Sequence, residues 1–292
     1  MSLNTDNWCI LMINKKISDN QVSMLYILVV LLATWTFAFL IFAKPAVGLS
    51  MFVGIMFFPA IIAIIFNILE RKSFRSMFKC VTTKLNLKSM IFGIGYPILF
   101  IAICATIALL TGLGYFNPAS LGGSSFAAVL ITSIILIIVN LIPVFGEEYG
   151  WRGYLLPKLT KSMGKITATI IVGIVWALFH FPIVYLLASA TGIGNPLLVA
   201  LIQACAAFVF SFSFSYSYYL SGSIIPVMFY HSTWNVVNTL ILGDIYTKNL
   251  GLIAGNIPYI SGEGLLGVIL GGILAVWFIL QFKKFDKYSN RI

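Results

Sequence analysis

Long apolar runs separated by short polar connections make up the chain from Val22 onward. A helix needs about 20 apolar residues to cross the hydrocarbon core of a bilayer. By this criterion we predict eight spanning helices within one all-α, polytopic integral membrane domain covering residues 1–292. Their approximate positions are residues 22–43, 46–69, 89–111, from 126 into an acidic stretch at 147–152, 166–189, 197–220, 223–242 and 265–282.

Residues 208–219 do not follow a helical pattern, because aromatic residues and serines alternate there with the period of a β-strand. An isolated strand leaves its backbone polar groups unsatisfied in lipid, so we predict a helix. On a helix the serines fall four residues apart, as do Gly267 and Gly271 near the C-terminus. Such small residues let membrane helices approach closely, and we interpret them as packing positions.

The composition supports this class of protein. Of 292 residues, 60% are hydrophobic and 9% are charged, a balance that soluble domains do not have. The net charge is +10, but the positive residues lie between the apolar runs, which indicates a role in membrane orientation and not nucleic-acid binding. With the N-terminus in the cytoplasm, all lysines and arginines except Lys44 and Lys248 fall on the cytoplasmic side. We therefore predict a multi-pass cell-membrane protein with both termini cytoplasmic, and its short loops are typical of a prokaryotic protein.

Acidic residues are rare, and we place only Glu147 and Glu148 of the eight in an apolar context. A charge near the bilayer centre costs on the order of 3 kcal/mol on an insertion scale, and such residues are usually functional. Glu148 and Arg152 are four residues apart and can pair along a helix, either to lock the fold or to support a site. Glu147 then points about 100° away and is free for other contacts.

The two histidines of the chain, His180 and His231, both lie in predicted spans, and Asn235 shares a helix face with His231. From the helical rise, Glu147 and His231 each lie about 15 Å from the cytoplasmic surface, which favours a shared site. Each histidine alone is equally well explained by a hydrogen bond to a neighbouring helix. We interpret the three tryptophans near these residues as interfacial or packing residues; they are Trp151, Trp176 and Trp234.

These residue types suit one kind of chemistry. A buried carboxylate can take a proton from water, and neutral imidazoles can hold that water or a metal ion. An asparagine amide can donate a hydrogen bond to a developing oxyanion. Together they are equipped to hydrolyse an amide bond inside a membrane.

Three motifs follow one another on three predicted helices: Glu147-Glu148-x-x-x-Arg152, Trp176-x-x-x-His180 and His231-x-x-x-Asn235. This order resembles the CPBP family, the CAAX-protease and bacteriocin-processing group of intramembrane proteases. The family is also called Abi and is related to type II CAAX prenyl endopeptidases. The resemblance covers roughly residues 131–238, which we expect to form a CAAX-protease-like core. One departure is Trp176, which stands where the family commonly has phenylalanine.

The resemblance implies an eight-helix fold with an intramembrane polar cavity open to the cytoplasm. By the family pattern, Glu147 would activate water with help from His180, and His231 and Asn235 would stabilise the oxyanion. Glu148 and Arg152 would support the site. The family is often described as metalloprotease, and Glu147, His180 and His231 would be the ligands if a zinc ion were bound. The sequence leaves this cofactor open.

Our leading hypothesis is a glutamate-dependent intramembrane endopeptidase that hydrolyses a membrane-associated or prenylated peptide or protein. Its expected partners are membrane lipid and this substrate, whose prenylation the sequence does not specify, and no nucleic acid. A second hypothesis is a non-catalytic membrane scaffold or bacteriocin self-immunity protein. A third is a proton-coupled transporter, which is disfavoured because the polar residues lie only in the second half, without an inverted repeat.

Overall fold

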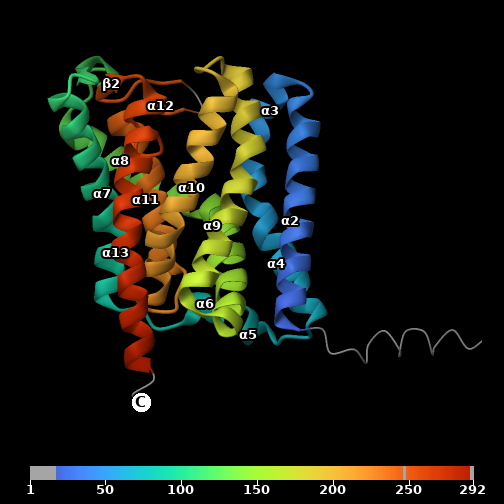
Figure 1. The fold of residues 1–292 in the computed structure, drawn as a ribbon. Coiled ribbons are helices and arrows are strands. Elements are labelled where there is room, and N and C mark those ends of the chain that lie inside the picture. Colours follow the sequence, from blue (N-terminus) through green and yellow to red (C-terminus); the bar gives the residue numbers. More distant parts are fainter. Residues whose placement is uncertain (1–17, 246–247, 290–292) are drawn as a thin grey trace, which may run out of the picture.

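The computed structural model describes residues 18–245 and 248–289, and these form a bundle of helices that run up and down along one common direction (Figure 1). Each predicted span corresponds to a helical segment. The second span consists of three consecutive pieces, α3 (Pro45–Met51), η1 (Phe52–Phe57) and α4 (Phe58–Leu69). The others are α2 (Asp19–Phe42), α7 (Leu87–Leu110), α8 (Phe126–Glu148), α9 (Leu156–Thr191), α10 (Pro196–Tyr219), α11 (Ile225–Leu242) and α13 (Leu265–Ser289).

Within the described residues, six helical stretches are long and apolar enough to cross a membrane. One of them, residues 126–191, is 66 residues long and contains both α8 and α9. The chain changes direction within α9 at Gly164, whose φ of +79° is readily adopted only by glycine. Helix α11 has 18 residues and is not one of the six. The all-α, polytopic membrane fold is therefore confirmed, although length and apolarity alone select fewer spans than we predicted.

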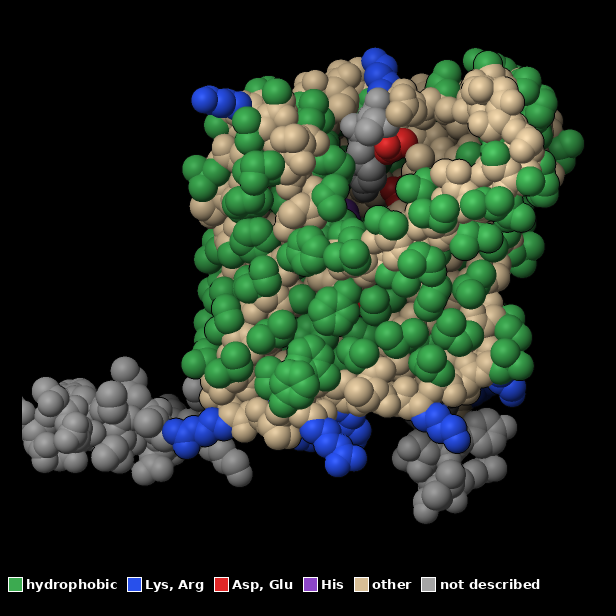
Figure 2. All heavy atoms as spheres, turned by 180° about the vertical axis from the view of Figure 1, so that it is seen from behind, with side chains coloured by type: hydrophobic (Ala, Val, Ile, Leu, Met, Phe, Trp, Pro, Cys, Tyr) green, Lys and Arg blue, Asp and Glu red, His purple; other side chains and the backbone are tan. Residues whose placement is uncertain are grey.

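The two ends of the bundle differ in charge. The short helices α5 (Phe74–Met77) and α6 (Lys79–Thr82) lie at the end where α13 finishes, and we call this the basic end (Figure 1). The opposite end holds α3, α12 (Ile257–Ile260), the short helix η2 (Pro118–Leu121) and two strands. These strands, β1 (Gly114–Phe116) and β2 (Ile253–Gly255), pair antiparallel. Figure 2 shows a mainly hydrophobic face between the ends, with Lys and Arg side chains gathered mainly at the basic end and few at the other.

Two parts of the orientation prediction need comment. Lys15 and Lys16 lie outside the described residues. Arg152, which we counted among the cytoplasmic loop charges, is fully buried, because it pairs with Glu148 inside the bundle.

Helices α9 and α10 pack closely through small residues. Ser211, Ser213, Ser215 and Ser217 are all buried on α10. A Cβ added to Gly173 of α9 would come within 2.4 Å of the Ser211 hydroxyl oxygen, so the two backbones approach as only glycine permits. Residues 208–219 are thus helical and serve packing, as predicted.

The end of α8 is fitted equally tightly against the second span. A Cβ on Gly146 would lie 2.4 Å from the carbonyl oxygen of Met56, and one on Gly150 would lie 2.4 Å from Cβ of Pro59. After Glu148 the helix widens into one π-helical segment, η3 (Tyr149–Leu155), before α9 begins. Such π-helical segments in longer helices are frequent at functional sites. This junction fixes the direction in which the acidic side chains project.

Candidate active site

Glu147 lies in the last turn of α8 and its side chain is buried. Its Oε2 atom accepts a 2.7 Å hydrogen bond from the indole Nε1–H of Trp176 and a longer one, 3.4 Å, from that of Trp151. Both bonds that the described residues make to this carboxylate end on Oε2. The two indoles therefore orient the carboxylate and leave Oε1 available to a water molecule or a substrate.

Glu148 points to a different set of partners. Both of its carboxylate oxygens accept from Nη1 of Arg152, at 3.0 and 3.1 Å, which confirms the predicted pairing along the helix. Oε1 of Glu148 also lies 2.8 Å from Nδ1 of His231 on α11. Glu148 and Arg152 are both fully buried, so removal of either charge would leave the other without compensation.

Trp176 links all of these groups. Its ring lies 5.4 Å from that of His180 and 5.8 Å from that of His231. The guanidinium of Arg152 lies 4.4 Å from its centroid and 4.8 Å from that of Phe214. These aromatic faces stabilise a buried cation whose Nε and Nη2 atoms have no hydrogen-bond partner within the described residues.

The interpretation of the tryptophans as interfacial or packing residues was incomplete. Trp151, Trp176 and Trp234 are all buried. Each donates its indole N–H to a glutamate, so these residues position polar groups besides filling space. Sequence alone gave no signal for this, because a tryptophan in an apolar run is equally consistent with the membrane interface.

His180 lies one helical turn after Trp176. Its Nδ1 atom is 2.9 Å from the backbone carbonyl oxygen of Trp176. A carbonyl oxygen can only accept, so Nδ1 carries the proton of this bond. In the neutral ring, Nε2 therefore presents a lone pair that can accept a proton or a hydrogen bond.

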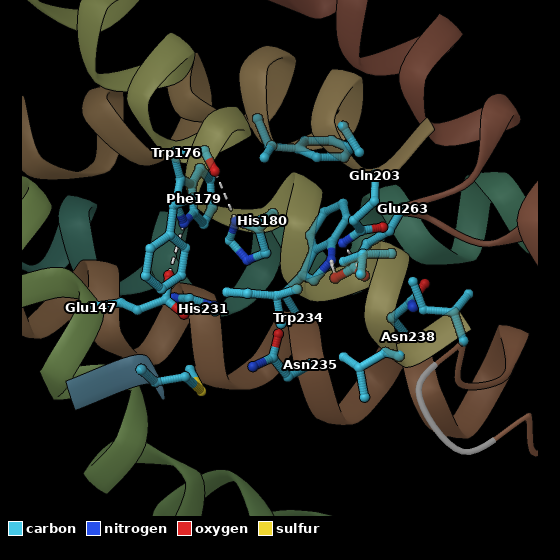
Figure 3. Close-up of a pocket in the computed structure, with 18 of the residues that line it drawn as sticks. Glu147, Trp176, Phe179, His180, Gln203, His231, Trp234, Asn235, Asn238 and Glu263 are labelled. Carbon is cyan, nitrogen blue, oxygen red and sulfur yellow. Dashed lines mark hydrogen bonds between the residues drawn. The ribbon is translucent and has the colours of Figure 1, made fainter. Parts of the chain in front are cut away.

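One cavity of about 220 Å³ brings the predicted catalytic residues together. Glu147, His180, His231 and Asn235 all line it, and Figure 3 shows the first three grouped toward one end with Asn235 farther along α11. The described residues that line this cavity do not include Glu148 or Arg152, which support His231 from outside it. Three helices distant in sequence thus contribute to one site, as the motif order implied.

The other end of the cavity was not predicted. Glu263, between α12 and α13, accepts from Nε2 of Gln203 at 2.8 Å and from Nε1 of Trp234 at 2.9 Å. Asn238 and Asp244 also line this end. We had treated Glu263 as a loop residue. The available signal was its position two residues before an apolar run in a chain with only eight acidic residues.

The cavity extends toward the end opposite the basic end. Its lining includes Phe52 at the start of η1, Leu187 near the end of α9, and Ile245 and Glu263 in the loops beyond α11. Figure 2 shows acidic side chains in a hollow close to this end, with a histidine deeper inside. If the basic end faces the cytoplasm, this opening faces away from it. The implied opening to the cytoplasm therefore does not agree with the predicted orientation.

An apolar groove of about 770 Å³ adjoins the cavity on its side. It runs between α8, η1 and α11, and its wall consists mainly of aliphatic and small side chains. The groove and the cavity share Val53, Asn140, Asn235 and Thr239. Because many of the large apolar side chains of α8 are exposed, the groove lies at a lipid-facing surface and leads to the polar site.

The geometry does not fit a zinc centre. Among the described residues, no three His, Cys, Asp or Glu side chains are grouped closely enough to hold a metal ion. Oε2 of Glu147 accepts from two indoles and Nδ1 of His231 donates to Glu148, so these bonds orient the two side chains. Glu147, His180 and His231 therefore share a cavity without forming a ligand set.

Comparison with known proteins agrees with the motifs. Residues 127–237 match the family model described as type II CAAX prenyl endopeptidase Rce1-like. The chain is also 27% identical over 160 residues to "CAAX prenyl protease 2" of Methanococcus maripaludis. That alignment covers 52% of this chain and 57% of the relative, so the chain spans little more than half the length of the relative it matches. The resemblance to the type II CAAX prenyl endopeptidases is confirmed for the segment that carries Glu147, His180, His231 and Asn235.

Proposed function

We propose that the protein is a glutamate-dependent intramembrane endopeptidase. The observation that carries this proposal is the orientation of Glu147, a buried carboxylate held at Oε2 by two indole N–H groups. It lines one cavity with both histidines and Asn235. The family match to residues 127–237 favours peptide-bond hydrolysis as the chemistry.

In the proposed reaction, a water molecule sits between Oε1 of Glu147 and Nε2 of His180. Glu147 takes a proton from this water while the water oxygen attacks the carbonyl carbon of the scissile peptide bond. The resulting tetrahedral intermediate carries its negative charge on the former carbonyl oxygen. Glu147 then passes this proton to the leaving nitrogen, the C–N bond breaks, and a carboxylic acid and an amine are released.

The side chains of α11 stabilise the intermediate. Asn235 donates its amide N–H to the oxyanion, and His231 donates from Nε2 when both of its ring nitrogens carry protons. Glu148 fixes the ring of His231 through Nδ1, and Arg152 holds Glu148 in turn. Glu148 and Arg152 are thus positioning residues, and the proposed catalytic residues are Glu147, His180, His231 and Asn235.

The substrate we propose is a peptide or protein that carries an apolar segment. The side groove is open to lipid and reaches Asn235, so a prenyl chain or an apolar peptide segment can lie there while the peptide bond enters the cavity. The proposed setting is a multi-pass membrane protein with the basic end in the cytoplasm, as the positive-inside rule indicates.

The test is cleavage of a peptide panel by purified, reconstituted protein, with fragments identified by mass spectrometry. The panel contains prenylated peptides and plain apolar peptides of matched sequence. Wild type is compared with Glu147→Gln, and with Asp19→Asn as a control for loss of a partly exposed carboxylate far from the cavity. We expect cleavage by wild type and Asp19→Asn that is lost in Glu147→Gln and resists a zinc chelator. Absence of Glu147-dependent cleavage, with folded protein, would favour the scaffold hypothesis.

A further inference from the structure

Glu263 lies outside the segment that matches the family, yet it lines the same cavity as Glu147. Figure 3 shows it beside Gln203 at one end of the cavity, with Glu147 and Trp176 at the other end and Trp234 between them. A substrate bound at the proposed catalytic residues therefore extends toward this carboxylate.

The loop before α13 is locked so that Glu263 faces the cavity. Oδ1 of Asn238 accepts from the backbone N–H of Gly262 at 2.9 Å, and Nδ2 of Asn238 donates to the Ser261 hydroxyl at 3.1 Å. The same hydroxyl accepts from the backbone N–H of Glu263 at 3.1 Å. Ser261 and Asn238 are both buried, so these bonds are sheltered from water.

Glycines complete the fit of this loop. A Cβ on Gly262 would lie 2.8 Å from Oδ1 of Asn238, and one on Gly267 would lie 1.7 Å from the carbonyl oxygen of Gly262. The first turn of α13 therefore packs directly on the loop. These contacts hold Glu263 in place, although no motif identified it.

The acidic side chains that line this end of the cavity are Glu263 and Asp244. The two side chains that donate to Glu263, Gln203 and Trp234, are neutral. Asp244 adds a second carboxylate to the lining. None of the described lining residues is Lys or Arg, although the chain as a whole carries a net charge of +10. In a partly buried site this arrangement attracts a cation and repels a carboxylate.

We propose that Glu263 is a specificity-determining residue that binds a positively charged group of the substrate, a lysine or arginine side chain or a free amino terminus. This inference rests on the proposed function and adds a substrate class to it. The preferred peptide carries a basic residue on the side of the scissile bond that points to the α12–α13 loop. A carboxylate at the same position is rejected.

The test uses sets of peptides in which one position near the scissile bond is varied at a time. That position carries Lys, Gln or Glu. We expect one position at which wild type cleaves the Lys peptide about tenfold faster than the Gln peptide, a typical effect of a partly buried ion pair, with the Glu peptide slowest. In Glu263→Gln, the Lys-to-Gln ratio of kcat/KM falls to about one. The matched control, Glu70→Gln, removes a carboxylate that does not line the cavity and keeps the wild-type ratio.

Binding separates this proposal from the proposed function. The affinities of the same peptides are measured for two proteins. One is the single variant Glu147→Gln, which does not cleave them, and the other is the double variant Glu147→Gln with Glu263→Gln. A preference for Lys that disappears with Glu263 supports the subsite even if no cleavage is detected. Equal affinity for the Lys and Gln peptides, or a preference that survives Glu263→Gln, overturns it. If Glu263→Gln does not fold, the wild-type comparison of the Lys, Gln and Glu peptides decides.

Discussion

The indole N–H of Trp176 lies 2.7 Å from Oε2 of Glu147, and this bond joins α9 to the end of α8 inside the cavity. The same indole packs against the rings of both histidines and against the guanidinium of Arg152. One side chain thus contacts residues of all three motifs. It stands where the related family commonly has phenylalanine, which supplies the ring but not the N–H.

Replacing Trp176 by phenylalanine tests this relationship. Trp176→Phe keeps an aromatic ring in the site but removes the 2.7 Å hydrogen bond to Glu147. A hydrogen bond to a charged group contributes about 1.5–3 kcal/mol, so we expect kcat to fall roughly 10- to 100-fold. The control, Trp277→Phe, changes a partly exposed tryptophan on α13 and should alter kcat less than about twofold. Equal kcat for wild type and Trp176→Phe would show that the bond does not position Glu147.

The buried pair of Glu148 and Arg152 predicts a large effect on stability. Glu148→Gln leaves Arg152 fully buried without a carboxylate and removes the partner of His231. Breaking a buried ion pair costs about 3–5 kcal/mol, which thermal unfolding in detergent would register as a marked drop in Tm. Asp19→Asn removes the partner of Lys161 in an exposed pair and should cost no more than about 1 kcal/mol. Similar Tm values for the two variants would contradict the buried pairing.

The close approach of α8 to the second span predicts a steric effect. In Gly146→Ala, the added methyl group would lie 2.4 Å from the Met56 carbonyl oxygen, so the end of α8 must shift. We expect a loss of stability of about 1–3 kcal/mol, together with reduced cleavage because Glu147 moves with the helix. Gly272→Ala adds a methyl group to α13 where nothing lies within 4 Å, and helix propensity alone should make it neutral or slightly stabilising. Unfolding curves and kcat of both variants check this prediction.

A carboxylate at the basic end makes stability depend on pH. Burial raises the pKa of Glu70, but hydrogen bonds from Lys158 and Tyr154 and the nearby lysine charges outweigh this and hold the pKa below its ordinary value of 4.5. The folded pKa is depressed, so the stabilisation is complete above about pH 4.5 and is lost as the pH falls through the folded pKa. Glu70→Gln should therefore lower Tm at pH 7, and its difference from wild type should shrink in acid. A constant difference down to about pH 3 would contradict the depressed pKa.

The sequence specified the helical segments well, because lipid permits few alternatives for an apolar run. Residues 208–219 illustrate this, since the strand-like alternation gave way to a helix as that argument required. The motifs also identified side chains that meet in one cavity, because residues four apart on a helix share a face.

Other features could not be read from the sequence because they depend on contacts between distant segments. Glu263 enters the cavity only because Asn238 and Ser261 hold its loop against α11. The hydrogen bonds of Trp176 and Trp234 depend on which glutamate each indole meets in the folded bundle. The direction of the opening depends on how these loops cap the helices, which no local pattern records.

The most direct test of the central claim is the single-turnover rate of peptide-bond cleavage by Glu147→Gln relative to wild type. Both proteins are reconstituted in vesicles of the same composition and shown to have equal Tm. Each is then mixed, in molar excess, with one peptide that wild type cleaves. Glutamine keeps an acceptor oxygen for the two indoles but cannot take a proton from water. We predict a rate lower by a factor of about 10² to 10⁴, the usual contribution of a general base. A rate equal to that of wild type would contradict the assignment of Glu147 as the group that activates water.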